Sequence, residues 1–175
     1  ASTDTYSRPM ATDSIQSYLE RKGLVAITGV DTRALVRKIR SEGAMNCLIS
    51  SETTDIATLK KQLAEVPNMK GLELSSKVTT AEPYDVGDPD ATFKVAALDL
   101  GIKKNILRNL IERDCLVRVF PARTDFNEIN DWGPHGFFIS NGPGDPAAMD
   151  YAVNTAKQIL ATEKPVFGIC LGHQI

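Results

Sequence analysis

Short apolar runs alternate with amphipathic, helix-like segments through the second half of the chain. Strands are predicted at 94–100, 116–120, 136–140 and 165–169, and helices at 105–113, after Asp125 and at 150–160. Strands that alternate with helices over short loops predict a parallel sheet with helices on both faces. The predicted fold class is therefore α/β, with a parallel sheet flanked by helices. In such sheets, ligands bind outside the carboxyl ends of the strands.

The first half of the chain predicts part of a smaller mixed α/β domain. Helices are expected from Thr12-Asp13 to Gly23, from Asp31 to Gly43 and from Thr54-Asp55 to about Leu63, with short strands at 24–27 and 47–49. Residues 81–92 contain two Pro, one Gly and four acidic residues without an apolar period, so they predict a linker. We therefore expect two domains, 1–91 and 92–175.

Composition excludes several classes of protein. The chain of 175 residues is 42% hydrophobic with a net charge of −2, which is typical of a globular protein and argues against a nucleic-acid-binding surface. No apolar run approaches the roughly 20 residues that span a bilayer, so no membrane role is predicted. Three widely spaced cysteines favour a reducing compartment, and we expect a cytoplasmic location. Both ends are expected to be cut, since the chain lacks an initial Met.

A lone cysteine follows the last predicted strand, where a helix could begin. The segment Gly168-Ile-Cys170-Leu-Gly172 has the layout of a nucleophile elbow, a sharp strand-to-helix turn that exposes one side chain above the sheet. The N–H groups of a helix start also favour a thiolate. A cysteine alone is more often a packing residue. The flanking glycines fit the strained turn, so we predict that Cys170 is a nucleophile.

A second unusual loop, Ser140-Asn-Gly-Pro-Gly-Asp-Pro146, follows the strand before it. An ordinary turn is the alternative, but two Gly and two Pro fix a backbone path with N–H groups open to a ligand. The loop lacks the Lys-Ser/Thr of a phosphate loop and the third Gly of a dinucleotide site. We expect an oxyanion hole, with the N–H groups of Gly142 and Leu171 as donors.

Neither histidine is predicted to act as the base for Cys170. His173 is expected to point away along the new helix, and His135 lies in a turn before a strand, at the opposite sheet edge. The spacing of Cys170 and His173 is that of half a zinc site, but the second pair is missing, so no metal is expected. The Lys103-Lys104 helix start is interpreted as scaffold rather than as a contact with substrate or partner.

With both loops considered, the chain resembles a known family. The segments 140–146 and 168–174 resemble class I glutamine amidotransferases. Further segments, Gly23–Arg33, Lys77–Thr80 and Gly101–Arg108, resemble the small chains of carbamoyl phosphate synthetases. The resemblance extends over residues 12–175. It identifies 1–91 with the end of the family's N-terminal domain plus a linker, and 92–175 with the first half of its amidotransferase domain.

The resemblance implies an activity and a set of site residues. Cys170 would attack the side-chain amide of L-glutamine, form a thioester and release ammonia, while glutamine and the oxyanion would contact Gly142, Gly144, Leu171 and Gln174. The ammonia would pass to a large synthetase subunit, or a fused synthetase domain, that makes carbamoyl phosphate from bicarbonate for arginine and pyrimidine synthesis. ATP and metal ions are expected on that large subunit, with no cofactor in this chain.

The resemblance also implies what these residues lack. The family's His base and its Glu partner lie downstream of the cysteine motif, so we expect residues 1–175 alone to be inactive and unstable as a monomer. Two alternatives stay open: a non-catalytic docking fragment of the same chain, and the amidotransferase domain of another biosynthetic enzyme.

Overall fold

The computed structural model describes residues 11–175, and the chain forms two compact units, 1–68 and 69–175. The described part of the first unit contains three helices, α1 (Ile15–Arg21), α2 (Thr32–Glu42) and α3 (Ile56–Ala64). A side-chain oxygen caps each helix, because Ser14, Asp31 and Asp55 accept hydrogen bonds from the N–H groups of Ser17, Ala34 and Thr58. The three predicted helices are confirmed.

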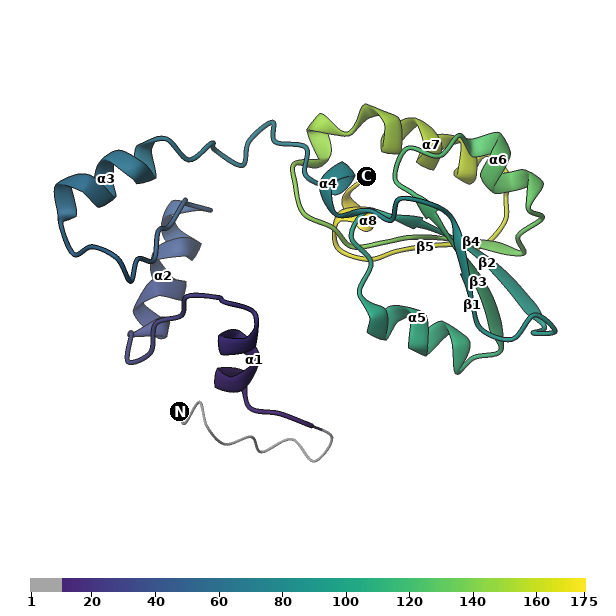
Figure 1. Ribbon diagram of the computed structural model, residues 1–175. Coiled ribbons are helices and arrows are strands. Elements are labelled where there is room, and N and C mark those ends of the chain that lie inside the picture. Colours follow the sequence, from purple (N-terminus) through teal and green to yellow (C-terminus); the bar gives the residue numbers. More distant parts are fainter. Residues whose placement is uncertain (1–10) are drawn as a thin grey trace. The chain divides into compact units, whose positions relative to one another are not determined.

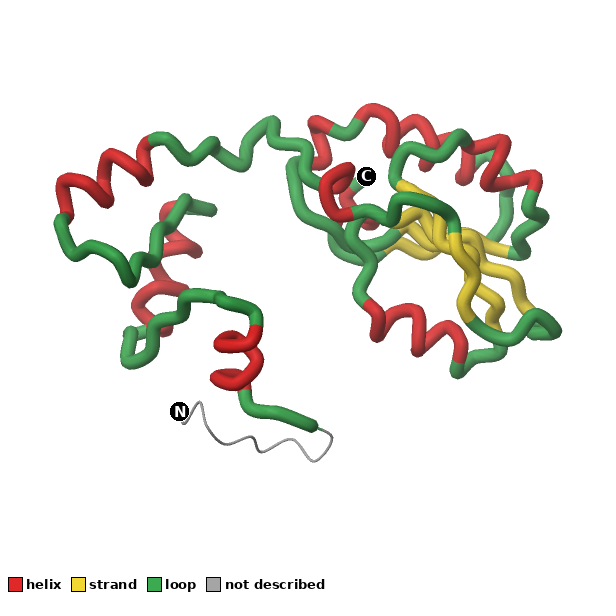
Figure 2. Tube along the Cα trace, in the orientation of Figure 1, coloured by secondary structure: helices red, strands yellow, loops and turns green. Residues whose placement is uncertain are grey.

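The two strands predicted in the first unit are wrong. Residues 24–27 and 47–49 are irregular, and no strand occurs in the described residues 11–68 (Figure 2). Leu24, Val25 and Ile27 are each more than half exposed. A strand needs a neighbouring strand to satisfy its N–H and C=O groups, and these segments find none in the described part of the unit.

The second unit is built on a five-stranded sheet in the order β1-β3-β2-β4-β5 (Figure 1). Its strands are β1 (Tyr84–Val86), β2 (Phe93–Asp99), β3 (Cys115–Pro121), β4 (Gly136–Ile139) and β5 (Val166–Gly168). The four strands β2 to β5 are parallel, and β1 joins β3 antiparallel. The predicted α/β class with a parallel sheet is confirmed, and so are the four predicted strands.

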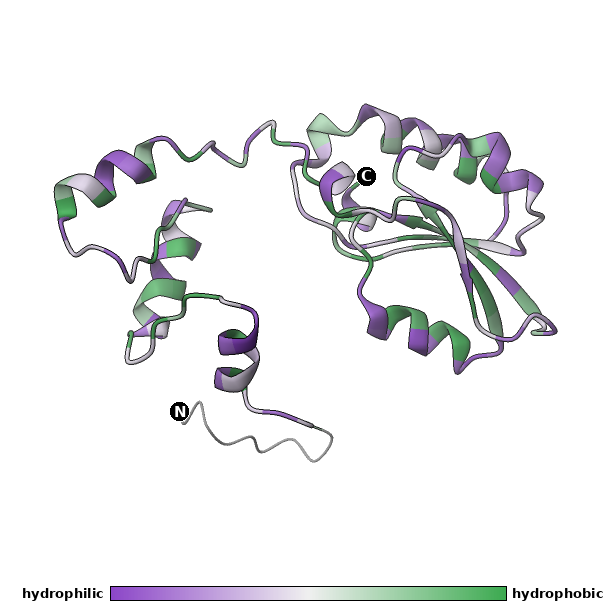
Figure 3. Cartoon of the chain, in the orientation of Figure 1, coloured by the Kyte–Doolittle hydropathy of each residue, from purple (hydrophilic) through white to green (hydrophobic). Residues whose placement is uncertain are grey.

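Helices cover both faces of the sheet, as predicted (Figure 1). On one face α5 (Lys104–Ile111) places Leu107 against a core that contains Ala97, Val117, Val119 and Phe138. On the other face α6 (Phe126–Asp131) and α7 (Asp150–Leu160) pack on a larger core with Leu98, Phe120 and Ile139. The central strands β2, β3 and β4 are largely hydrophobic (Figure 3) and mostly buried, because helices cover both of their faces.

The expected linker at 81–92 is wrong as an unstructured segment. Tyr84–Val86 forms the edge strand β1, held by two hydrogen bonds of 2.6 Å from the Arg118 guanidinium to the Asp85 carboxylate. The compact unit begins at Met69 rather than at 92 and also includes α4 (Ser75–Val78). The remaining elements are a 3₁₀ turn, Pro146–Ala148, and the C-terminal α8 (Leu171–Gln174).

Candidate active site

The carboxyl ends of β2, β4 and β5 lie at one edge of the sheet. Leu98 is paired with Ile139, and Ile139 with Gly168, so the loops that follow these strands leave side by side, as predicted. They enclose a surface pocket of about 440 Å³. Its walls are formed by Gly101, Lys103, Ile106, Asn141, Gly142, Pro143, Ile169 and Cys170. The structure thus brings the predicted nucleophile and the predicted oxyanion loop into one pocket.

Cys170 occupies a strained turn between β5 and α8. Its φ of 53° and ψ of −112° lie outside the regions that residues other than glycine usually adopt. Its side chain is exposed, while its carbonyl accepts hydrogen bonds from the N–H groups of His173 and Gln174 at 3.0 and 3.2 Å. The sharp strand-to-helix turn predicted at this position is therefore present in the backbone. Strain of this kind persists only where the surrounding structure holds it.

The elbow is packed against the end of β4. The Gly172 N–H donates to the Ser140 carbonyl at 3.1 Å, and the Ile169 N–H donates to the Ile139 carbonyl at 3.1 Å. A Cβ on Gly172 would lie 2.2 Å from the Ile139 oxygen, so no larger residue fits. These contacts fix Cys170 beside the loop that leaves β4.

The loop that follows β4, residues 140–146, which we call the Gly142 loop, is held equally firmly where it leaves the strand. The buried Ser140 hydroxyl accepts from the Leu100 N–H at 2.9 Å and donates to the Asn141 carbonyl at 2.8 Å. The Asn141 side-chain amide donates to the Gly101 carbonyl at 2.9 Å. A Cβ on Gly142 would lie 2.0 Å from the Leu100 oxygen. This loop is a fixed part of the site rather than an adaptable surface turn.

The predicted glutamine-contacting residues are only partly in the pocket. Gly142 lines it, whereas the backbone of Gly144 pairs with Glu73 in an isolated antiparallel bridge. The Leu171 side chain is buried in the core, and its N–H is in the first helical turn, where no intrahelical acceptor exists. Gln174 is exposed on α8. Sequence reasoning missed Lys103 as a wall residue, although its place after a strand end was a signal.

Both histidines occupy the predicted kind of position. The His135 ring Nδ1 accepts from the Lys94 N–H at 3.1 Å, at the amino ends of β2 and β4 and thus at the edge opposite Cys170. His173 is exposed on α8 and does not line the pocket. Within residues 11–175, no three His, Cys, Asp or Glu side chains gather as a metal site would require. None of the helices described there is long and apolar enough to cross a membrane.

The exposed Cys170 thiol and the Gly142 loop thus share one pocket at the carboxyl edge of the sheet, where ligands bind in folds of this kind. The sequence matches the models of two protein families. Residues 96–175 match the model of the family "Glutamine amidotransferase class-I". Residues 1–49 match the model "Carbamoyl-phosphate synthase small chain, CPSase domain".

Curated relatives match across both units. The carbamoyl phosphate synthase small chain of Chlorobaculum tepidum is 46% identical over 99% of this chain and 48% of the relative. The small chains of Nostoc sp. PCC 7120 and Escherichia coli K12 are 48% and 42% identical, over 94% of this chain and 46% and 47% of their own lengths. The chain belongs to the carbamoyl phosphate synthase small-chain family.

This family membership helps to decide between the two alternatives that the sequence left open, a docking fragment and the amidotransferase domain of another enzyme. The match over residues 1–49 is to a small-chain domain, so an amidotransferase domain of another biosynthetic enzyme is disfavoured. The chain spans about half the length of the curated relatives it matches.

Proposed function

We propose that the complete protein is the glutamine-hydrolysing component of a carbamoyl phosphate synthase. The observation that carries this proposal is the exposed, strained Cys170 in one pocket with the Gly142 loop. Relatives named as carbamoyl phosphate synthase small chains support it.

In this reaction the Cys170 sulfur attacks the side-chain carbonyl carbon of L-glutamine. The N–H groups of Gly142 and Leu171 stabilise the negative oxygen of the tetrahedral intermediate, which collapses to a thioester as the amide nitrogen takes a proton and leaves as ammonia. Water then attacks the thioester carbonyl, releasing glutamate and restoring the thiol. Gly144 and Gln174 are proposed to hold the amino-acid end of the substrate.

The proton transfers require a general base, whose contribution is about 10²–10⁴ in rate. His135 lies at the wrong edge and His173 outside the pocket, so we propose that the base comes from a part of the protein outside these residues. The ammonia would be used by a large synthetase subunit or fused domain that carries the ATP and metal sites, in the cytoplasm.

The test is glutamine hydrolysis by the full-length protein with Cys170→Ser. Loss of the nucleophile is expected to lower kcat on the order of 10⁶-fold. Cys47→Ser is the matched control, because Cys47 is another exposed thiol outside the site, and it should leave kcat unchanged. Equal ammonia release by the Cys170→Ser variant and the wild type would refute the proposal.

The second candidate is a docking role without catalysis. A glutamine analogue with a diazoketone in place of its amide separates the two. The analogue should alkylate Cys170 of a working site selectively over Cys47, which is also exposed, whereas a docking fragment should be labelled at both cysteines at the rate of free thiols.

A further inference from the structure

The far side of the Gly142 loop is held by a segment that comes from long before it in the sequence, residues 71–76, which we call the brace. The Leu72 carbonyl accepts from the Asp145 N–H at 3.0 Å, and the Gly71 N–H donates to the Asp145 carboxylate at 2.8 Å. Glu73 and Gly144 pair as an antiparallel bridge between these contacts. The brace thus lies along the loop as a short strand would.

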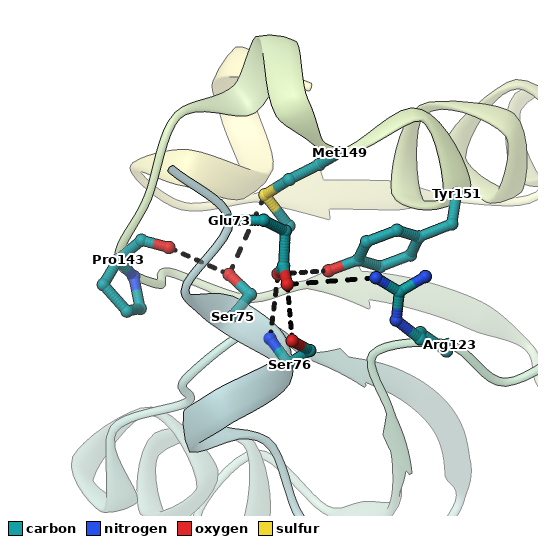
Figure 4. Close-up of polar contacts among 7 residues, drawn as sticks. All are labelled: Glu73, Ser75, Ser76, Arg123, Pro143, Met149 and Tyr151. Carbon is teal, nitrogen blue, oxygen red and sulfur yellow. Dashed lines mark hydrogen bonds and ion pairs between the residues drawn. The ribbon is translucent and has the colours of Figure 1, made fainter. Parts of the chain in front are cut away.

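Brace and loop are in close contact. A Cβ on Gly144 would lie 3.0 Å from both the Leu72 oxygen and the Leu74 nitrogen, and Gly144 has a positive φ of 112°. The fully buried Ser75 hydroxyl donates to the Pro143 carbonyl at 3.0 Å and lies 3.8 Å from the Met149 sulfur (Figure 4). A shift of the brace therefore requires a shift of the loop between Gly142 and Asp145.

The Glu73 carboxylate fixes the brace in turn. One oxygen accepts from the Ser76 N–H and from the Tyr151 hydroxyl, each at 2.9 Å, and the other accepts from the Ser76 hydroxyl and lies 3.8 Å from the Arg123 guanidinium (Figure 4). Tyr151 is on α7, and Arg123 follows β3 and stacks 4.1 Å from the Tyr151 ring centre. The Glu73 side chain thereby ties the brace to helix α7 and to the turn that follows β3.

The charge of Glu73 is stabilised in this position. Burial raises its pKa, but hydrogen bonds from Ser76 and Tyr151 and the charge of Arg123 outweigh burial, so the pKa lies below its ordinary value. Burial, together with the Glu73 carboxylate, raises the pKa of Tyr151, which keeps its proton for donation to Glu73. At neutral pH the network is complete.

We propose that Glu73 is a positioning residue for the Gly142–Gly144 loop, and through that loop for the oxyanion of the substrate. This inference rests on the proposed glutamine hydrolysis. Glu73 touches neither the pocket nor Cys170. It acts by holding the brace against Gly144, so that the Gly142 N–H keeps its direction when charge develops on the substrate oxygen.

The experiment compares Glu73→Gln with Asp85→Asn in the full-length protein. Both variants replace a carboxylate that accepts hydrogen bonds and pairs with an arginine, but Asp85 pairs with Arg118 between β1 and β3, away from the brace. Glu73→Gln should lower kcat for glutamine hydrolysis about 10- to 100-fold with little change in KM, because a small misplacement weakens transition-state contacts most. Asp85→Asn should leave kcat unchanged.

Tyr151→Phe is the milder second variant, since it removes one donor and keeps the ring under Arg123. It should lower kcat by less than Glu73→Gln does. The inference would be overturned if kcat were unchanged in both Glu73→Gln and Tyr151→Phe. It would also be overturned if Asp85→Asn lost as much kcat as Glu73→Gln, which would leave Glu73 a merely structural residue. A wild-type protein without glutaminase activity would instead refute the proposed function.

Hydrogen exchange supplies a readout that does not depend on activity. The Asp145 N–H donates a hydrogen bond to the Leu72 carbonyl of the brace. Because Glu73→Gln loosens the brace, this N–H should exchange faster in that variant than in the wild type, and at the wild-type rate in Asp85→Asn. Exchange of Asp145 that is identical in all three proteins would refute the positioning role, whatever the activity of the wild type.

Discussion

At the scale of single residues, the site depends on glycines at positions where the Cβ of any other residue would collide with the backbone of a neighbouring element. Cys170 is exposed in a strained turn, yet its neighbour Leu171 is buried in the core and Gly172 touches the end of β4. The strain at Cys170 is offset by the hydrogen bonds that its carbonyl and the Gly172 N–H make. The turn therefore presents the sulfur to solvent while both sides of it are anchored.

Substitution of Gly172 by Ala should disable the site. The new Cβ would meet the Ile139 oxygen at 2.2 Å, and relief of the clash must move the elbow, at a cost of about 1–3 kcal/mol of stability. We expect a large loss of kcat for glutamine and slower alkylation of Cys170 by the diazoketone analogue. Both are measured in the full-length protein.

Gly133→Ala is the control for this prediction. Gly133 has a φ of 72° and nothing within 4 Å of its Cβ position, so the variant loses about 1–2 kcal/mol through backbone strain alone. It should be destabilised to a similar degree and keep its kcat. Retention of full activity by Gly172→Ala would contradict the account of the elbow.

At the residue level, the sequence was enough to predict that Cys170 and Gly142 lie at the same edge of the sheet. Cys170 and Gly142 follow the ends of neighbouring strands, and the structure places both in one pocket. Glu73 was beyond such reasoning, because its partners Arg123 and Tyr151 lie about 50 and 78 positions away in the sequence. In the sequence, Glu73 is a single glutamate between two leucines, and this local pattern does not indicate either partner.

At the scale of elements, the buried strands were predictable and the edge strand was not. β2, β3 and β4 are mostly apolar because helices cover both of their faces. β1 has only three residues, among Pro, Gly and acidic neighbours, and it is ordered by pairing with β3 and by the Asp85–Arg118 contact. The reverse error at 24–27 has the same cause, since an apolar run without a pairing partner remains irregular.

The brace should contribute to stability in a pH-dependent way. The pKa of Glu73 in the folded protein is below its ordinary value of 4.5, so its contribution is complete above that pH and is lost as the pH falls through the lowered pKa. Glu73→Gln has no such titration. The difference in melting temperature between wild type and Glu73→Gln should be constant near neutrality and shrink below about pH 4.5. A difference that grows on acidification would contradict the ionised network.

At the scale of the whole molecule, the two units differ in how much they bury. The second unit contains both hydrophobic cores, whereas in the described residues 11–68 only Ser14 is buried. Leu35, Val36 and Ile39 share one face of α2 and are each at least 40% exposed. Helices in proteins are stabilised mainly by packing of such a face. The described residues 11–68 therefore do not bury the apolar face of α2 among themselves.

Residues 1–175 expressed by themselves should accordingly fail in two separate ways. They should release no ammonia from glutamine, because neither His135 nor His173 is placed to act on Cys170. They should also bind a hydrophobic dye or self-associate, because the described residues 11–68 leave the apolar face of α2 exposed. The full-length protein, measured beside them for glutaminase activity, dye binding and sedimentation, should be active and bind less dye per molecule. Glutamine turnover by the isolated residues would contradict this prediction and show that a group within them serves as the base.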